Sequence, residues 1–206
     1  MSVIIFDFDG TIADSFDYVF DFLAVGTVAA NYDAGQRQSF RGLSMATLAR
    51  GLGHRWWRLP NLFLKGRRQM QGAIKHVKPF DGMTEVIQKL HAEGHELFIV
   101  SSNNVRNIHD FLHTHDLHTY FLEIYGSVGL FGKAPTLRKL MKQQNFEVKD
   151  CTFIGDELRD VEAAKSLKMP IIAVSWGFAK RADLKKIHPT VLVDTPAGLL
   201  ERLQSL

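Results

Sequence analysis

Short apolar runs recur along the chain, and each one ends at a polar or glycine-rich cluster. Within a run the apolar residues are continuous instead of alternating with polar ones. Continuous apolarity predicts strands that are buried on both faces, as in parallel sheets that are covered by helices. The expected strands are Val3–Phe6, Glu96–Val100, Leu122–Val128, Cys151–Gly155, Pro170–Val174 and Thr190–Val193.

The segments between most of these runs show helical periodicity. The segment "MTEVIQKLHAEG" places Val86, Ile87 and Leu90 on one face and ends at Gly94, a residue type that favours helix C-termini. The same kind of pattern occurs in residues 136–144 and 158–168. Alternation of strands and helices predicts an α/β protein with a doubly wound parallel sheet.

The region from residue 15 to residue 77 interrupts this alternation. It contains no strand-like run, and it offers helical stretches at residues 16–30, 44–52 and 56–74. We therefore expect a helical insertion of residues 15–77 after the first strand. The α/β core would then consist of residues 1–14 and 78–206.

Composition excludes several classes of protein. Cys151 is the single cysteine among 206 residues, so an internal disulfide is impossible and a reducing compartment is favoured. No apolar stretch approaches the ~20 residues that span a bilayer, and no basic segment typical of a signal peptide opens the chain. A net charge of +3 weakly favours anionic ligands and is far from typical of a nucleic-acid-binding protein. We expect a soluble, cytoplasmic protein.

Polar residues follow three of the expected strands. Because the carboxyl ends of parallel strands meet at one edge of a sheet, where ligands bind in such folds, these residues should gather there. Crowded carboxylates are costly without a cation, and hard oxygen ligands suit Mg²⁺, which often recruits a substrate phosphate as well. The residues concerned are Asp7, Asp9, Ser101, Ser102, Asp156 and Asp160.

The two acids after the first strand could have different catalytic roles. In extended chain Asp7 and Asp9 share a face, so one could attack phosphorus while the other transfers protons. Gly10 would permit close backbone approach, and the amides of Gly10 and Thr11 could face phosphate oxygens. Each motif alone also has a simpler interpretation, as a turn or a helix N-terminus. Their joint occurrence, each after a buried strand, is far more specific.

Four segments together resemble the signature motifs of the haloacid dehalogenase-like hydrolases. These segments are "DFDGTIADS", "IVSSN", the lysine in "FGKAPT" and "IGDELRD". The resemblance covers nearly the whole chain and is strongest for the phosphoglycolate phosphatase-type subgroup. It implies a Rossmann-like core, a helical cap of the C1 type at residues 15–77, and Mg²⁺ as the cofactor.

The resemblance also implies a role for each matching residue. Asp7 would be the nucleophile that becomes an aspartyl-phosphate, and Asp9 the general acid/base, with its backbone carbonyl on Mg²⁺. Lys133 would neutralise phosphate charge and orient Asp7. Asp156 would be the metal carboxylate, supported by Asp160. Phosphate would be bound by the Ser101 hydroxyl and by backbone amides of Gly10, Thr11 and Ser102.

Three details qualify these roles. The lysine motif usually continues Lys-Pro, whereas this chain has Lys133-Ala134-Pro135. The choice of Ser101 over Ser102 rests on register alone. True dehalogenases of this superfamily lack a carboxylate at the position of Asp9, so its presence argues for phosphate chemistry.

Other features have two interpretations. Arg41 in "FRGLS" is a candidate contact for an anionic substrate tail or an ordinary surface arginine. The spacing of His109 and His113 would permit zinc, but a solvated helix face is the simpler explanation. Trp56 and Trp57 lie in a basic stretch that could touch nucleic acid or membrane, or could pack within the cap.

The sequence thus predicts an enzyme, a Mg²⁺-dependent phosphatase that acts on a small phosphate monoester resembling phosphoglycolate. A phosphosugar mutase of the same superfamily is the alternative, and a non-catalytic phosphate-binding or nucleic-acid-binding module is another. We expect a small phosphorylated metabolite as the ligand, with neither nucleic acid nor membrane as a partner. The substrate and the oligomeric state are left open.

Overall fold

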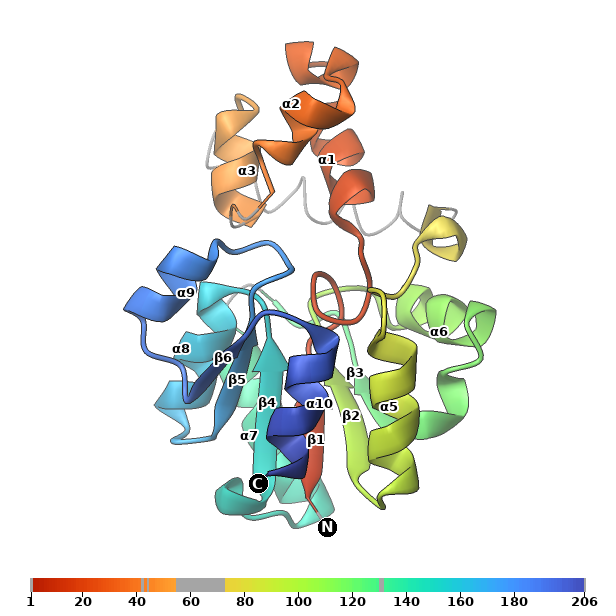
Figure 1. Ribbon diagram of the computed structural model, residues 1–206, viewed down its shortest axis with the longest axis vertical. Helices are drawn as coiled ribbons and strands as arrows, with labels where there is room; N and C mark the ends of the chain where they lie inside the picture. Colours follow the sequence, from red (N-terminus) through yellow and green to blue (C-terminus); the bar gives the residue numbers. More distant parts are fainter. Residues whose placement is uncertain (1, 42, 44, 55–72, 130–131, 206) are drawn as a thin grey trace.

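The computed structural model describes residues 2–41, 43, 45–54, 73–129 and 132–205. Its centre is a six-stranded sheet in which every pair of neighbours runs parallel (Figure 1). The order is β3-β2-β1-β4-β5-β6, so the chain changes direction across the sheet between β1 and β4. The strands are β1 (Val3–Phe6), β2 (Glu96–Val100), β3 (Phe121–Tyr125), β4 (Cys151–Gly155), β5 (Ile171–Val174) and β6 (Val191–Val193).

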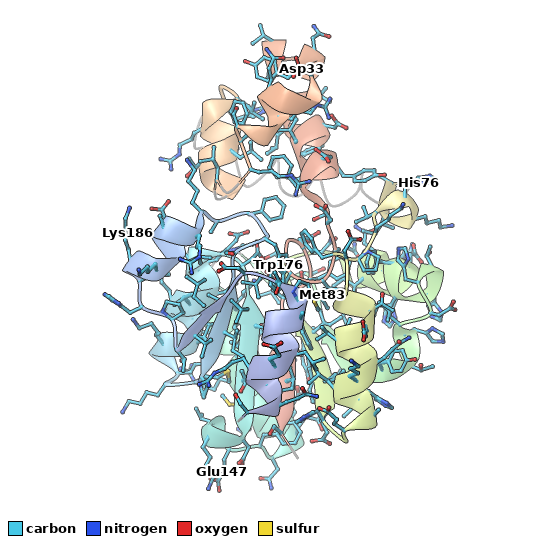
Figure 2. The ribbon with its side chains drawn as sticks, viewed as in Figure 1. Asp33, His76, Met83, Glu147, Trp176 and Lys186 are labelled. Atoms are coloured by element: carbon cyan, nitrogen blue, oxygen red, sulfur yellow. The ribbon has the colours of Figure 1, made fainter. Side chains whose placement is uncertain are left out.

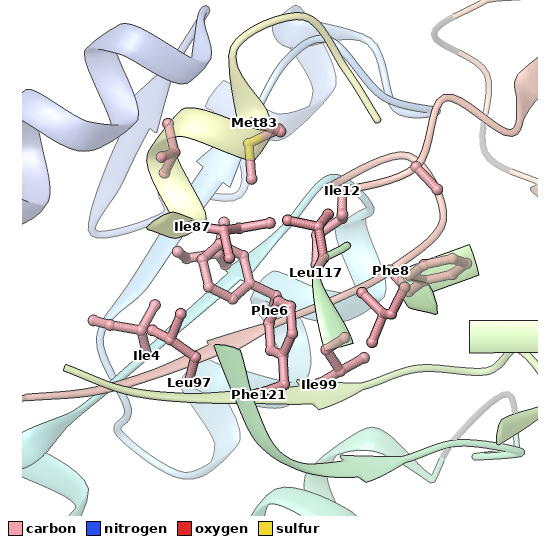
Figure 3. Packing of buried hydrophobic residues seen from close by; sticks show 14 of the residues in the cluster. Ile4, Phe6, Phe8, Ile12, Met83, Ile87, Leu97, Ile99, Leu117 and Phe121 are labelled. Carbon is pink, nitrogen blue, oxygen red and sulfur yellow. The ribbon is translucent and has the colours of Figure 1, made fainter. Parts of the chain in front are cut away.

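Successive residues of the central strand belong to different hydrophobic clusters. Ile4 and Phe6 pack with α5 (Met83–Ala92), α6 (Val105–Thr114) and α10 (Pro196–Gln204) on one face. Figure 3 shows Phe6 between residues of β2, β3 and α5. Val3 and Ile5 pack with α7 (Lys133–Gln144), α8 (Leu158–Ser166) and α9 (Arg181–Lys186) on the other face. Burial on both faces explains the continuous apolar runs, and the predicted doubly wound α/β fold is confirmed.

Two boundaries differ from the expected ones for identifiable reasons. Strand β3 ends at Tyr125, three residues early, because the chain turns back and the Ser127 amide donates to the Asn103 carbonyl. Helix α7 begins at Lys133, three residues before the periodicity indicated. Pro135 lies in its first turn, where a helix needs no amide donor, so the shifted proline of this motif is accommodated.

The inserted region forms a separate group of helices beyond the carboxyl ends of the strands (Figure 1). Helix α1 stops well before the expected end at residue 30, because Gly26 has a φ of +75° and a 3₁₀ turn follows. A short helix capped by Asp33 was not predicted, and the helix expected at 44–52 is present. The described elements are α1 (Phe16–Ala24), η1 (Val28–Asn31), α2 (Ala34–Gln38), α3 (Met45–Gly51) and η3 (Ile74–His76).

These cap helices have a small core of their own. Phe16 and Phe20 of α1 pack with Leu48 of α3, and Phe178 joins this cluster from the α/β core. The third expected helix, including Trp56 and Trp57, lies outside the described residues. The two linkers run side by side, since the Asp14 amide donates to the Lys78 carbonyl at 2.9 Å. The division into a core and a cap at residues 15–77 remains a prediction.

None of the helices in the described ranges is both long and apolar enough to cross a bilayer.

Replacing the central aromatic of β1 should destabilise the protein strongly. Phe6 is fully buried, so Phe6→Ala should lower the free energy of unfolding by about 3–5 kcal/mol through lost burial and a residual cavity. Leu122 on the edge strand is 64% exposed, and Leu122→Ala should change it by no more than about 0.5 kcal/mol. Urea denaturation followed by circular dichroism measures both. Equal losses in the two variants would contradict the assigned positions.

Candidate active site

Three buried aspartates form a cluster beyond the ends of β1 and β4, the two strands between which the strand order changes direction. Asp7 directly follows β1, and its amide extends the ladder by donating to the Ile154 carbonyl of β4 at 2.8 Å. Asp156 follows β4, and Asp160 lies in the first turn of α8. Oxygens from Asp7, Asp156 and Asp160 lie within 4.8 Å of one another, and all three residues are buried. A cation could be held there.

Lys133 joins two of these carboxylates. Its Nζ donates to Asp7 Oδ2 at 2.6 Å and also contacts Asp160 Oδ1. Only 2% of Lys133 is exposed, so the ammonium has little access to water. Burial alone would lower the pKa of Lys133, but the charges of Asp160 and Asp7 outweigh it and raise the pKa above its ordinary value. Lys133 is therefore a fixed positive charge beside Asp7.

Asp160 mainly orients its neighbours. Its Oδ1 meets Lys133, and its Oδ2 accepts from the Glu157 amide at 3.0 Å. Position 155 must be a glycine, because a Cβ there would lie 2.6 Å from Asp160 Oδ2. The carboxylate thus supports Lys133 from α8.

Asp156 accepts two hydrogen bonds and is closely approached by Gly10. The Thr11 hydroxyl donates to Oδ1 at 3.0 Å, and the Phe178 amide donates to Oδ2 at 2.7 Å. Gly10, with a φ of +78°, passes so close that a Cβ would lie 2.3 Å from Asp156 Oδ2. Burial first, and then the charge of Asp7, raise the pKa of Asp156 well above its usual range.

The amides of Gly10 and Thr11 have hydrogen-bond partners within their own loop. The Gly10 amide donates to the Ala13 carbonyl at 3.0 Å, and the Thr11 amide donates to the Phe8 carbonyl at 3.3 Å. The predicted contact of these two amides with phosphate remains a prediction. Thr11 contributes its hydroxyl to Asp156, and Gly10 contributes space.

Asp9 lies outside the three-aspartate cluster and is held by the loop after β2. Asn103 Nδ2 donates to both Asp9 oxygens, at 3.2 and 2.9 Å. The side-chain oxygen Oδ1 of Asn103 accepts in turn from Asn107 Nδ2 and from the Asn104 backbone amide, which fixes the orientation of the Asn103 side-chain amide. Burial raises the pKa of Asp9, and hydrogen bonds such as that from Asn103 offset this in part. A raised pKa suits a proton donor.

The two serines after β2 have different partners. Ser101 is buried, and its Oγ accepts from the Asn103 amide at 3.0 Å. Ser102 is half-buried, and its Oγ accepts from Arg159 Nη1 at 3.2 Å. Each hydroxyl keeps a proton to donate, so the predicted contact of Ser101 with phosphate, and any role of Ser102, remain predictions.

Arg41 lies on the cap side of the linker. Its guanidinium donates to Asp14 Oδ1 at 3.1 Å and Asp17 Oδ2 at 3.4 Å, and it lies 4.6 Å from the centre of the Phe16 ring. Arg41 therefore ties the cap to the first linker. Its predicted contact with substrate remains a prediction.

The histidine-rich segment contributes no residue to the three-aspartate cluster. His113 and His118 are exposed and stack on each other, with 4.1 Å between ring centres. Within the described ranges, the acidic group of Asp7, Asp156 and Asp160 is the one arrangement of three or more ligands that could hold a metal.

Sequence reasoning missed several residues of the site. Gly177 would place a Cβ 2.3 Å from both Asp156 Oδ2 and the Gly10 carbonyl, so only glycine fits. Trp176 Nε1 donates to the Thr11 carbonyl at 3.2 Å, and Figure 2 shows Trp176 where the core meets the cap. The segment "SWGF", which follows the strand expected at Pro170–Val174, was the available signal. Asn103 and the pair Glu157–Arg159 were also unassigned, although both lie within the quoted motifs.

Positive charge in the site falls short of negative charge. Lys133 and Arg159 face the five carboxyl groups of Asp7, Asp9, Asp156, Glu157 and Asp160. Burial first, and then the nearby Asp160, raise the pKa of Asp7 to about 7 against the opposing effect of Lys133. A bound cation would relieve this imbalance.

Residues 4–174 match the model of the haloacid dehalogenase-like hydrolases. The chain belongs to this family. It is 30% identical to the phosphoglycolate phosphatase of Synechococcus elongatus over 100% of this chain and 99% of that protein. It is also 28% identical to a 5'-nucleotidase of Pseudomonas aeruginosa over 61% of this chain and 58% of that protein. The predicted resemblance and enzyme class, a hydrolase of the phosphatase type, are confirmed.

Solved structures share the fold. A haloacid dehalogenase-like hydrolase from Streptococcus pneumoniae superposes with a TM-score of 0.77 at 22% identity, covering 98% of each chain. A hydrolase from Pseudomonas syringae gives 0.74 at 18% identity over 100% of this chain and 99% of that chain.

Glycine at position 177 should be indispensable. Gly177→Ala should displace Asp156 and weaken Mg²⁺ binding, and overpacking of this kind should cost about 1–3 kcal/mol of stability. Gly129→Ala is the control, since a Cβ there meets nothing within 4 Å. Calorimetric titration with MgCl₂ and thermal melting measure the two effects. Wild-type Mg²⁺ affinity in Gly177→Ala would refute this role.

The buried carboxylates should make cation-free stability fall as pH rises. Because the pKa values of Asp7 and Asp156 are raised on folding, the folded state holds more protons than the unfolded chain between about pH 4 and pH 7, so the unfolding free energy declines across this range. A cation needs deprotonated ligands, so MgCl₂ should raise the melting temperature more at about pH 8 than at about pH 5.5. NaCl of equal ionic strength is the control. Equal shifts at both pH values would contradict this.

Proposed function

We propose that the protein is a Mg²⁺-dependent phosphatase that hydrolyses a small phosphate monoester through an aspartyl-phosphate on Asp7. The observation that carries this proposal is the contact of Lys133 with Asp7 inside a buried cluster of three aspartates. Such a group joins a nucleophile, a fixed cation and a metal-binding surface. Membership of the family and the full-length similarity to a phosphoglycolate phosphatase support the same reaction.

The residues fit a hard divalent cation. Asp7 and Asp156 offer carboxylate oxygens, and the Asp9 backbone carbonyl is the further ligand that the family resemblance implies. All of these are oxygen ligands, which Mg²⁺ prefers over softer metals. Asp160 would support the site through Lys133. When bound, Mg²⁺ would neutralise charge on the phosphoryl oxygens and help orient the ester.

The first half of the reaction uses both acids of the β1 loop. A carboxylate oxygen of Asp7 attacks phosphorus, and the bond from phosphorus to the ester oxygen breaks. Asp9 donates its proton to the departing oxygen, so an alcohol leaves. Lys133 offsets charge on the transferring group and keeps Asp7 oriented.

The second half regenerates the enzyme. Asp9, now a carboxylate, takes a proton from water as the water oxygen attacks phosphorus. The bond from phosphorus to Asp7 breaks, and inorganic phosphate is released. Asn103 keeps the Asp9 carboxylate in place in both steps through its two hydrogen bonds.

The substrate is inferred from similarity and from the position of the cap. Phosphoglycolate or a comparable small ester is favoured by the phosphoglycolate phosphatase relative. Arg41 at the cap linker is the candidate contact for an anionic tail. Among the residues that the structure describes, no contact favours the mutase or the non-catalytic module. A cytoplasmic location and the absence of nucleic-acid partners remain predictions.

Loss of the nucleophile should abolish turnover. Asp7→Asn should lower phosphate release by at least about 1,000-fold, which is about 4 kcal/mol of barrier, and a chelator should have a similar effect on the wild type. Asp150→Asn is the control, since Asp150 is exposed just before β4, at the opposite edge of the sheet. Release of inorganic phosphate from a panel of small esters is the measurement. Undiminished activity in Asp7→Asn would disprove the mechanism, and isomerised hexose phosphate without release would indicate the mutase.

A further inference from the structure

We infer that Arg159, paired with Glu157, is a positioning residue that holds Ser102 and strengthens the binding of phosphate at the loop after β2. The inference rests on the proposed function, because it concerns the same site. It assigns a task to two residues of the "GDELRD" motif that the reaction steps above leave unused.

Arg159 bridges two catalytic segments. Its Nη1 donates to Ser102 Oγ at 3.2 Å, and its Nη2 donates to Glu157 Oε1 at 3.0 Å. Its Nε also lies 2.8 Å from Glu157 Oε2, which brings a second pair of oppositely charged atoms close together. Glu157 is 5% exposed and the Arg159 side chain 25% exposed, which makes this ion pair largely buried.

Helix stability does not explain an arginine at this position. Arg159 is the second residue of α8, and a cation in the first turn of a helix is disfavoured by the helix dipole. A bare guanidinium there would also be costly to bury, and Glu157 offsets its charge. The ion pair therefore places the Arg159 Nη1 donor beside Ser102 without adding net charge to the site.

The loop that Arg159 reaches is also held at Asn103, whose backbone carbonyl accepts from the Ser127 amide. Asn103 bonds Asp9 and also donates its amide to Ser101 Oγ. Arg159 fixes the opposite side of this loop through Ser102, next to Asp160 on the same helix. Arg159 thus connects the loop after β2 to helix α8, which also carries Asp160, the partner of Lys133.

The bond also changes the chemistry of the Ser102 hydroxyl. A hydroxyl has one proton to donate and two lone pairs to accept with. When its oxygen accepts from a guanidinium, its own proton becomes a stronger donor, because neighbouring hydrogen bonds polarise one another. Ser102 is then suited to donate to an anion such as phosphate.

The test is a double-mutant cycle between Arg159 and Ser102. We would measure kcat and KM for phosphoglycolate, and the dissociation constant of inorganic phosphate by calorimetry, both with MgCl₂. The variants are Arg159→Gln, Arg159→Lys, Ser102→Ala and Ser102→Ala/Arg159→Gln. Because Arg159→Gln leaves Glu157 buried and unpaired, Glu157→Gln/Arg159→Gln is added, and melting temperatures identify variants that fail to fold. Arg202→Gln is the matched control, since Arg202 donates to Ser205 at 3.4 Å at the end of α10.

We expect Arg159→Gln and Glu157→Gln/Arg159→Gln each to raise KM and the phosphate dissociation constant by about tenfold. The value of kcat should change by no more than about threefold, because the interaction is made equally in the ground state and the transition state. Arg159→Lys should recover part of the affinity. The double variant with Ser102→Ala should be no weaker than the single variants, because Arg159 acts through Ser102. Arg202→Gln should match the wild type.

Each other outcome is informative. Unchanged phosphate affinity in the folded Glu157→Gln/Arg159→Gln variant would overturn the inference, and so would additive losses in the cycle. Wild-type hydrolysis with either result leaves the proposed function intact. If the wild type binds phosphate without hydrolysing esters, the phosphatase proposal fails while the cycle still decides on Arg159. If it does neither, both proposals are overturned.

Discussion

Repulsion among buried carboxylates is the constraint around which this molecule is arranged. Asp7, Asp156 and Asp160 lie within reach of one cation in surroundings where charge is poorly solvated. Lys133 offsets part of this charge, and the start of α7 at Lys133 places the ammonium between Asp7 and Asp160. The excess of negative over positive charge that remains would be offset by a divalent cation. The crowding of carboxylates that destabilises the cation-free protein therefore also favours cation binding.

Sheet register explains why so much of the site could be predicted. Phe6 is paired with Ile99 on one side and with Ile154 on the other, so the residues that follow emerge at nearly the same level. Continuous apolar runs identified these strands, and parallel pairing alone then brings Asp7, Ser101 and Asp156 to one edge. The fold class and the grouping of the acids follow from local patterns of this kind.

Other parts depend on contacts that no local pattern encodes. Gly177 is required by the approach of Asp156 and Gly10, which come from other strands. Asn103 was given no role from the sequence, yet its side chain holds Asp9. The amides of Gly10 and Thr11 were expected to face a ligand, but the loop satisfies them internally. For Gly177 and Asn103 the deciding neighbour is distant in sequence, and periodicity carries no information about it.

The cap and the acidic cluster share one residue, Phe178. Its amide donates to Asp156, whereas its ring lies 6.0 Å from that of Phe16 in the cap cluster. Interiors are densely packed, so a shift of α1 that displaces this ring also strains the backbone that holds Asp156. The loop after β5 therefore contacts both the cap cluster and the carboxylate of Asp156. The helices of the inserted region and the acids that could hold a metal are consequently linked within the fold through Phe178.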